Sequence, residues 1–142
     1  MSLTSYIGSN IELPLRDDEE ESRAKTLYIG PTFSNKASLE EVKETKFPTR
    51  YVYEVTFDWW GIELSHYQDE EMYEENKQAL YFLCDRMDAY LRPGECFYLY
   101  TCWIGDESNP KEAEVNLPLK DWYTEGMELK EQTLIRFVKN GS

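Results

Sequence analysis

Apolar and polar residues alternate along residues 51–60, which is the clearest strand pattern in the chain. The odd positions carry aromatic or branched apolar residues, and the even positions include Glu54, Thr56 and Asp58. Because successive side chains of a strand point to opposite faces, this pattern predicts a half-buried strand with one face largely in water. Gly61 permits a bend, and residues 62–67 are expected to form the second strand of the same hairpin.

The period changes to that of an α-helix between Asp69 and Leu91. Asp69 suits the N-cap position, and the two glutamates after it suit the positive end of the helix dipole. Pro93 and Gly94 are expected to end the helix. The pattern predicts one principal helix, about 69–91, whose buried side carries Tyr73, Leu80, Leu83, Cys84, Met87 and Leu91.

Further strands are indicated on either side of this helix. Residues 96–104 are apolar or aromatic at both alternating faces, which is typical of a central strand. Residues 26–29, 114–117 and 133–138 read as shorter strands, and Pro118 confines the second of them to an edge. We therefore expect an α+β fold: a mostly antiparallel sheet of five to six strands, with the principal helix packed on one face.

The domain organisation follows from length and from one acidic run. A chain of 142 residues is long enough for one core of moderate size. Residues 17–21 are five consecutive carboxylates, which have nothing to bury and repel one another. We expect residues 1–24 to be an N-terminal segment with an acidic linker, containing at most a short strand, and residues 25–142 to form a single α+β domain.

The charge balance excludes several classes of partner. The chain has 28 acidic and 15 basic residues, a net charge of −13 and 15% aromatic residues. A chain of this charge is repelled by phosphate backbones and anionic lipids, so we expect neither nucleic-acid nor membrane binding. No segment approaches the ~18 apolar residues of a membrane span, and no secretory signal is evident. Three widely spaced cysteines favour reduced core thiols, and a cytoplasmic location is expected.

Candidate catalytic and metal groups are few. His66 is the only histidine, and its neighbours Ser65 and Asp69 do not form a convincing triad, because adjacent strand residues point apart. The loop 106–109 offers oxygen ligands but lacks the spacing of a calcium loop. We therefore expect no catalytic residue, metal or cofactor, and interpret His66 as a partly exposed residue near a helix start.

The outer side of the principal helix is the most distinctive surface in the sequence. Carboxylates dominate it, and Phe82 stands almost opposite the buried side. An acidic helix face is usually only solvated surface, but an aromatic ring among carboxylates also suits a basic partner. The candidate partner-binding residues are Glu71, Glu74, Glu75, Gln78, Phe82 and Asp85, together with Trp60 on the wet side of the first strand.

Three functions remain open at this stage. The first is a small acidic intracellular protein that binds a basic protein partner, in the manner of an inhibitor or immunity protein. The second is a small enzyme or ligand-binding module, with an aromatic and acidic pocket between helix and sheet. The third is a structural domain that self-associates, for example as a homodimer. One deep pocket containing His66 would favour the second function, and a flat acidic face would favour the first.

Overall fold

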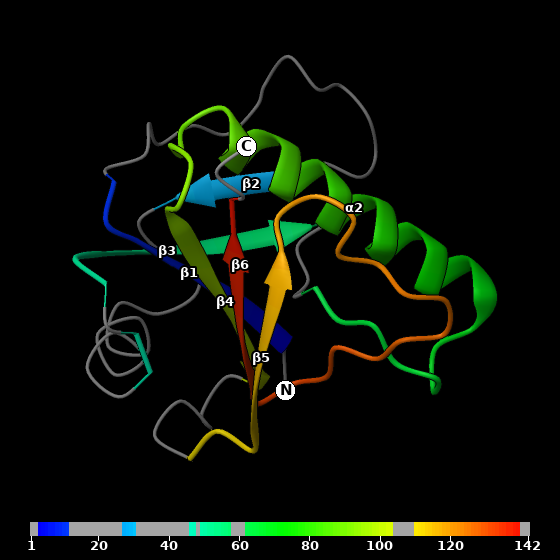
Figure 1. Cartoon of the computed structure of the whole chain (residues 1–142). Helices are drawn as coiled ribbons and strands as arrows, with labels where there is room; N and C mark the ends of the chain where they lie inside the picture. Colours follow the sequence, from blue (N-terminus) through cyan, green and yellow to red (C-terminus); the bar gives the residue numbers. More distant parts are fainter. Residues whose placement is uncertain are drawn as a thin grey trace.

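The centre of the fold is a six-stranded sheet, which the computed structural model describes together with the helix above it (Figure 1). The residues described are 3–11, 27–30, 46–47, 49–57, 62–103 and 110–139. The elements are strands β1 (Leu3–Ser9), β2 (Leu27–Gly30) and β3 (Tyr51–Phe57), helix α2 (Glu70–Asp88), and strands β4 (Cys96–Trp103), β5 (Ala113–Pro118) and β6 (Thr133–Val138). The strand order is β2-β3-β1-β4-β6-β5. All neighbours are antiparallel except β5 and β6, so the expected α+β fold is confirmed.

Strand β1 lies in the middle of this sheet. It pairs with β3 on one side and β4 on the other, so that Ile7 is opposite both Tyr53 and Leu99. All seven of its residues are buried. Although the sequence suggests at most a short strand in a segment outside the main domain, β1 is an integral part of the sheet. The boundary expected near residue 24 lies outside the described residues and stays a prediction.

Helix α2 begins where the sequence predicts. The Asp69 side chain accepts a hydrogen bond from the Met72 N–H at 2.7 Å, which satisfies one free donor of the first turn. The helix ends at Asp88 rather than near residue 91. Lys139 Nζ donates to the main-chain oxygens of Asp88 (3.0 Å) and Leu91 (2.8 Å), so a cation from the end of β6 serves the carbonyl end of the helix.

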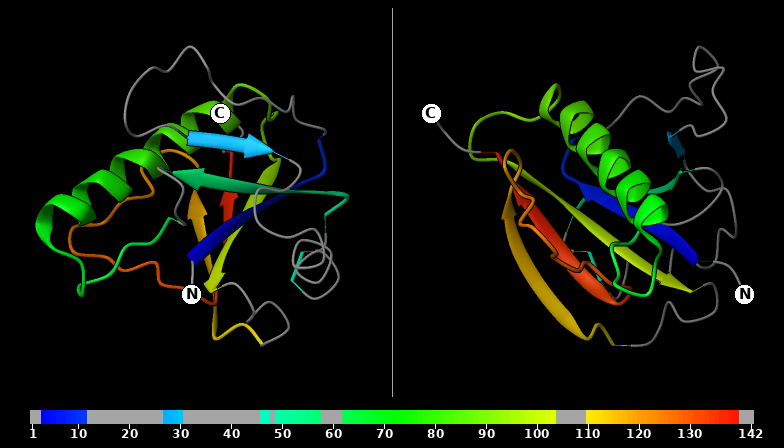
Figure 2. Two further views of the ribbon diagram at one scale, coloured as in Figure 1. Left: turned by 180° about the vertical axis from the view of Figure 1, so that it is seen from behind. Right: turned by 90° about the vertical axis from the view of Figure 1, so that its right-hand side faces the viewer.

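The main core lies between α2 and one face of the sheet (Figure 2). The predicted helix residues Leu80, Leu83, Cys84, Met87 and Leu91 are all buried there. Tyr73, expected on the buried side as well, is only partly buried at its margin. From the sheet, β1, β3, β4 and β6 contribute Ile7, Val55, Phe97, Leu99, Ile135 and Phe137.

The opposite face of the sheet is also covered, which corrects the expectation of a wet side on β3. Val52 is buried, and Glu54 is only 1% exposed. Phe47 packs on this face, and the Thr4 hydroxyl donates to Glu54 Oε2 at 2.9 Å. The alternation of residues 52–55 therefore separates two buried faces, one of which contains the hydrogen-bonded carboxylate of Glu54. Trp60, placed on the same face by sequence, lies outside the described residues.

The expected hairpin of residues 51–60 and 62–67 is wrong. Strand β3 is already paired on both sides, with β1 and with β2, so no edge is left for residues 62–67. This segment instead forms one isolated bridge, between Leu64 and Leu129. It is held on the sheet by Ser5 and Thr101: the Ile62 N–H donates to Ser5 Oγ, and the Thr101 hydroxyl donates to the Ile62 oxygen.

The parallel pair β5 and β6 is joined by residues 119–132, here called the crossover segment. It contains no helical residue, yet it is anchored in the main core by Leu119, Trp122 and Leu129. Trp122 packs on Tyr81 of α2, with ring centroids 4.8 Å apart. The crossover segment thus lies beside α2 and forms a second wall next to it.

Within the described residues, no helix is long and apolar enough to cross a membrane.

Candidate functional site

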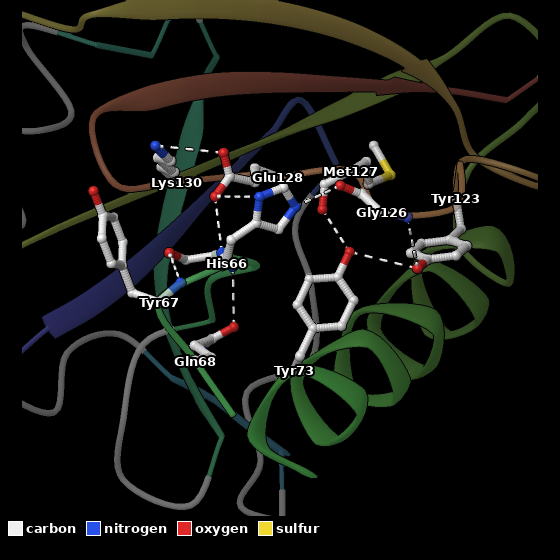
Figure 3. A network of polar contacts seen from close by, with 10 residues as sticks. His66, Tyr67, Gln68, Tyr73, Tyr123, Gly126, Met127, Glu128 and Lys130 are labelled. Atoms are coloured by element: carbon white, nitrogen blue, oxygen red, sulfur yellow. Dashed lines mark hydrogen bonds and ion pairs between the residues drawn. The ribbon is translucent and has the colours of Figure 1, made fainter. Parts of the chain in front are cut away.

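A groove lies between the first half of α2 and the crossover segment. Its volume is about 790 Å³. One wall comes from α2, a second from residues 65–68 before the helix, and a third from residues 123–126 of the crossover segment (Figure 3). The lining residues are Ser65, His66, Gln68, Glu70, Glu71, Tyr73, Glu74, Lys77, Tyr123, Glu125 and Gly126.

His66 is exposed at this groove, and its partners come from the crossover segment. Its main-chain N–H donates to Glu128 Oε2 at 2.8 Å. On the ring, Nδ1 lies 3.4 Å from the same oxygen and Nε2 lies 2.7 Å from the Gly126 carbonyl oxygen. The hydrogen bond from the His66 N–H is the main cause that lowers the pKa of Glu128. The sequence places an exposed histidine here, but it does not indicate these partners about 60 residues away.

Two tyrosines fix the helix to the crossover segment at the floor of the groove. The Tyr73 hydroxyl donates to the Met127 carbonyl oxygen, and it lies 3.4 Å from the Tyr123 hydroxyl. Because a phenol has one proton, the Tyr123 hydroxyl is the donor to Tyr73, and it accepts from the Gly126 N–H. Burial, followed by the contact with Tyr123, raises the pKa of Tyr73, so this phenol stays neutral at physiological pH.

The groove contains one lysine, and its charge is already paired. Lys77 Nζ lies 3.3 Å from Glu74 and 4.3 Å from the centroid of the Tyr123 ring. Gln78 also donates to Glu74, at 2.8 Å, and hydrogen bonds from Gln78 and Lys77 lower the pKa of Glu74. An ammonium group therefore sits between a carboxylate and an aromatic face, a combination that suits cations generally.

Three further carboxylates line the groove without such a partner. No hydrogen bond or ion pair within the described part of the chain involves the side chains of Glu70, Glu71 or Glu125. Glu70 and Glu71 are in the first turn of α2, where the helix dipole favours negative charge. Among the described residues, the groove thus has more carboxylates than cations paired with them.

The outer face of α2 continues from this groove. Five of the predicted partner-binding residues, Glu71, Glu74, Gln78, Phe82 and Asp85, are exposed, and Glu75 is half-buried beside them. Phe82 is 44% exposed, and the Arg86 guanidinium lies 5.4 Å from its ring centroid. The ring is therefore not surrounded by carboxylates alone. Glu71 and Glu74 belong to both the outer face and the groove, so the two form one acidic surface.

The groove could not be assembled from the sequence. Tyr73 is expected in the core, and Tyr123, Glu125 and Gly126 come from a stretch whose pattern is ambiguous. Tyr73 and Tyr123 are 50 residues apart, and no local period links them. The absence of a helical or strand period in 119–132, combined with its Trp and Tyr residues, is the one signal of a loop anchored in the core.

The other candidates contribute no chemistry to this site. Cys84 and Cys102 are buried and Cys96 is half-buried, and burial raises the pKa of the Cys84 thiol, which disfavours the reactive thiolate. The loop 106–109 lies outside the described residues. Among the residues described, no cluster of three or more His, Cys, Asp or Glu side chains could hold a metal ion.

Comparison with known proteins adds no further assignment. No family model matches the chain, and neither the curated proteins nor the solved structures contain a match. What the protein does must therefore be inferred from the acidic surface itself.

Proposed function

We propose that this protein acts by stoichiometric binding of a basic protein partner, in the manner of an inhibitor or immunity protein. The observation that carries this proposal is the continuity of the outer face of α2 with the groove at Glu71 and Glu74. The net charge of −13 extends the same attraction over the whole molecule. Charges of this kind accelerate the encounter with an oppositely charged partner and orient it.

Affinity requires more than attraction, because exposed ion pairs contribute little to binding. Phe82 provides an apolar group at the middle of the outer face, and a partner that covers this ring gains the burial typical of an interface anchor. The groove provides the second element. Glu70, Glu71 and Glu125, which have no ion pair with another described residue, and the tyrosine rings resemble the surroundings of Lys77, so a lysine or arginine of the partner is the group that suits the groove.

The test is capture and identification of the partner, followed by titration with the purified partner. The test variant is Glu71→Gln/Glu74→Gln, and the control is Glu112→Gln/Glu114→Gln. The control pair is exposed at the start of β5 and produces the same change in net charge away from the surface. We expect one basic protein to bind wild type and the control at one-to-one stoichiometry and the test variant at least tenfold more weakly. Equal affinity of all three proteins would refute the proposed surface.

One observation favours the ligand-binding or enzyme alternative. His66 is exposed at the groove beside the tyrosine pair, where an imidazole could contact a small molecule. If that function is the main one, His66→Ala abolishes it. If the protein acts by binding a basic partner, His66→Ala leaves the affinity within about threefold of wild type, since the ring is neither acidic nor on the outer face. Sedimentation of the free protein at high concentration checks self-association separately.

A further inference from the structure

The turn of residues 65–68, which forms the wall of the groove before α2, presents an aromatic side chain to solvent. Tyr67 is 93% exposed, more than any other large apolar residue described. Met72, in the first turn of α2, is exposed as well and follows five residues later in the chain. Single exposed apolar side chains are common on protein surfaces. What distinguishes Tyr67 is the construction of the turn that carries it.

All four main-chain N–H groups of this turn have an acceptor. The Ser65 N–H donates to Gln68 Oε1 at 3.0 Å, and the Gln68 N–H donates to the Ser65 carbonyl oxygen at 3.1 Å. The Tyr67 N–H donates to Ser65 Oγ at 3.1 Å, and the His66 N–H donates to Glu128 Oε2. Because each donor is satisfied within the turn or by the crossover segment, the main chain of the turn is fixed in one conformation.

The turn and its ring are also fixed to the rest of the molecule. Gln68 Nε2 donates to the Glu63 carbonyl oxygen at 3.1 Å, which connects the end of the turn to the segment before it. The Lys130 ammonium lies 5.7 Å from the centroid of the Tyr67 ring and pairs with Glu128 at 3.4 Å (Figure 3). A cation at this distance attracts an aromatic ring, so the crossover segment defines the position of the ring on one side.

A side chain held in this way is suited to anchor an interface. Binding costs less conformational entropy when a residue is already ordered in the free protein, and more of its burial then appears as affinity. Tyrosine combines a large rigid ring with few side-chain torsions, and it is enriched among the residues that dominate binding energies. Because Lys130 and Glu128 pair with each other beside the ring, Tyr67 contributes to binding through burial rather than through attraction of charge.

The carboxylates of the groove follow directly in the chain. Glu70 and Glu71 line the groove together with most of the turn. A ligand that covers Tyr67 and extends into the groove therefore meets an aromatic ring first and carboxylates next. An apolar side chain suits the first of these positions, and a cation suits the second.

We propose that residues 65–68 form a preorganised recognition turn, and that Tyr67 anchors a basic segment of the partner in which an apolar side chain adjoins a lysine or arginine. The apolar side chain packs on the exposed ring, and the cation enters the groove toward Glu70 and Glu71. The basic character of this segment rests on the proposed function. The turn itself follows from contacts within the chain.

The experiment selects phage-displayed random peptides on the wild-type protein and titrates the enriched peptides, in free form, against variants. We expect these peptides to combine lysine or arginine with an apolar residue, and to bind Tyr67→Ala at least about tenfold more weakly than wild type. Tyr90→Ala is the control for loss of an exposed tyrosine, because Tyr90 lies beyond the end of α2 and outside the acidic surface. Its affinity for the peptides should equal that of wild type.

The preorganisation of the turn is tested by Ser65→Ala. This change removes the acceptor of the Tyr67 N–H, while Ser65 itself is only 3% exposed and offers a ligand almost no surface. We expect peptide binding to weaken about threefold or more in wild type but by less than about 1.5-fold in Tyr67→Ala, because both changes act on one anchor. If Ser65→Ala does not fold, Gln68→Met takes its place, since it removes the acceptor of the Ser65 N–H.

Three results would overturn the recognition turn. The first is equal affinity of the enriched peptides for wild type and Tyr67→Ala, and the second is failure to enrich any peptide. The third is a mobile turn in the free protein: we expect an NMR order parameter of about 0.85 for the Tyr67 amide, and a value below about 0.6 would exclude preorganisation.

The same titrations separate this inference from the proposed function. Weaker binding to Tyr67→Ala with unchanged binding to Glu71→Gln/Glu74→Gln would support the turn and refute the acidic surface. The reverse pattern would refute the turn and leave the proposed function intact.

Discussion

The hydroxyl groups of Tyr73 and Tyr123 lie 3.4 Å apart and join helix α2 to the crossover segment. Since the Tyr73 proton is donated to the Met127 oxygen, the order of donors runs from Gly126 through Tyr123 and Tyr73 to Met127. This chain of contacts closes the floor of the groove with groups that belong to the protein. A partner therefore meets the carboxylates at the rim, while the phenols remain engaged with one another.

Removal of the Tyr73 hydroxyl should loosen this floor. Tyr73→Phe leaves the Met127 carbonyl oxygen without its donor, and we expect a loss of about 1 kcal/mol in the free energy of unfolding, measured by urea denaturation. Tyr123→Phe is the matched control. Its hydroxyl makes only the two longer contacts, at 3.4 and 3.3 Å, so a smaller loss is expected. A larger loss for Tyr123→Phe would contradict the assigned direction of the hydrogen bonds.

The orientation of α2 predicts a large effect of one core substitution. Leu83 is fully buried between the helix and the sheet, so Leu83→Ala should reduce the free energy of unfolding by about 2–5 kcal/mol. Asp85→Ala, two residues later on the outer face, should change it by about 0.5 kcal/mol or less. A loss below about 0.5 kcal/mol for Leu83→Ala, measured by chemical denaturation, would show that the helix faces another way.

The second buried face of the sheet makes Gly8 sensitive to any side chain. A Cβ at this position would lie 2.5 Å from Thr49 Oγ1 and 2.7 Å from Phe47 Cδ1. Gly8→Ala should therefore displace Phe47 and reduce the free energy of unfolding by about 1–3 kcal/mol. Gly94→Ala is the comparison variant that introduces backbone strain without a steric clash, because Gly94 has a φ of +91° and open space around it. If Gly8→Ala proves neutral, the packing of Phe47 and Thr49 against Gly8 is wrong.

The raised pKa of Glu63 predicts how stability depends on pH. The folded state holds the proton up to about pH 7, whereas the ordinary pKa is 4.5, so between these values the folded state binds more protons than the unfolded state. The stabilising contribution of protonated Glu63 is complete below pH 4.5 and is lost as the pH rises to 7. With allowance for solvent screening, the change amounts to about 1–2 kcal/mol.

The check is the difference between wild type and Glu63→Gln, because other groups with lowered pKa, such as Glu128, produce an opposite slope in the acid range. The free energy of unfolding of Glu63→Gln minus that of wild type should be about 1–2 kcal/mol larger at pH 8 than at pH 4.5. Urea denaturation at both pH values measures this. A difference that does not change with pH would mean that Glu63 titrates normally in the folded protein.

Elements defined by local periodicity could be predicted from the sequence. The buried side of α2 follows from the helical spacing of Leu80, Leu83 and Met87, and β4 follows from apolar residues at both faces. Strand pairing could not be predicted, since it depends on which distant segment competes best for an edge. β1 takes the place beside β3 that the hairpin of residues 62–67 would need, and nothing in the local pattern reveals that choice.

The candidate site divides in the same way. The outer face of α2 was accessible to prediction because the helical period fixes what lies opposite the core, as for Phe82 and Asp85. The groove was not, because Tyr123 and Glu125 come from a segment without a period, whose position is set by burial of Trp122. Arg86 shows a further limit: its position over the Phe82 ring depends on a side-chain rotamer that spacing alone does not determine.

The charges and the ring of the outer face should have separable effects on binding of a basic partner. Glu71→Lys/Asp85→Lys changes two exposed carboxylates, on either side of Phe82 in sequence. We expect slower association and a weaker dependence of that rate on salt, because steering acts over the ~10 Å screening length at 0.1 M salt. Phe82→Ala should instead accelerate dissociation, by about 30-fold if the ring provides about 2 kcal/mol as a buried anchor.

Surface-based kinetics against the captured partner at two salt concentrations separate these effects. Tyr90→Ala is the control for loss of an exposed aromatic ring, since Tyr90 is 37% exposed but lies beyond the end of α2, outside the acidic surface. Its dissociation rate should equal that of wild type. The free energy of unfolding should change little in all three variants, because none of the residues faces the core. Wild-type rates in both test variants would mean that the partner binds elsewhere, and the outer face would then be ordinary solvated surface.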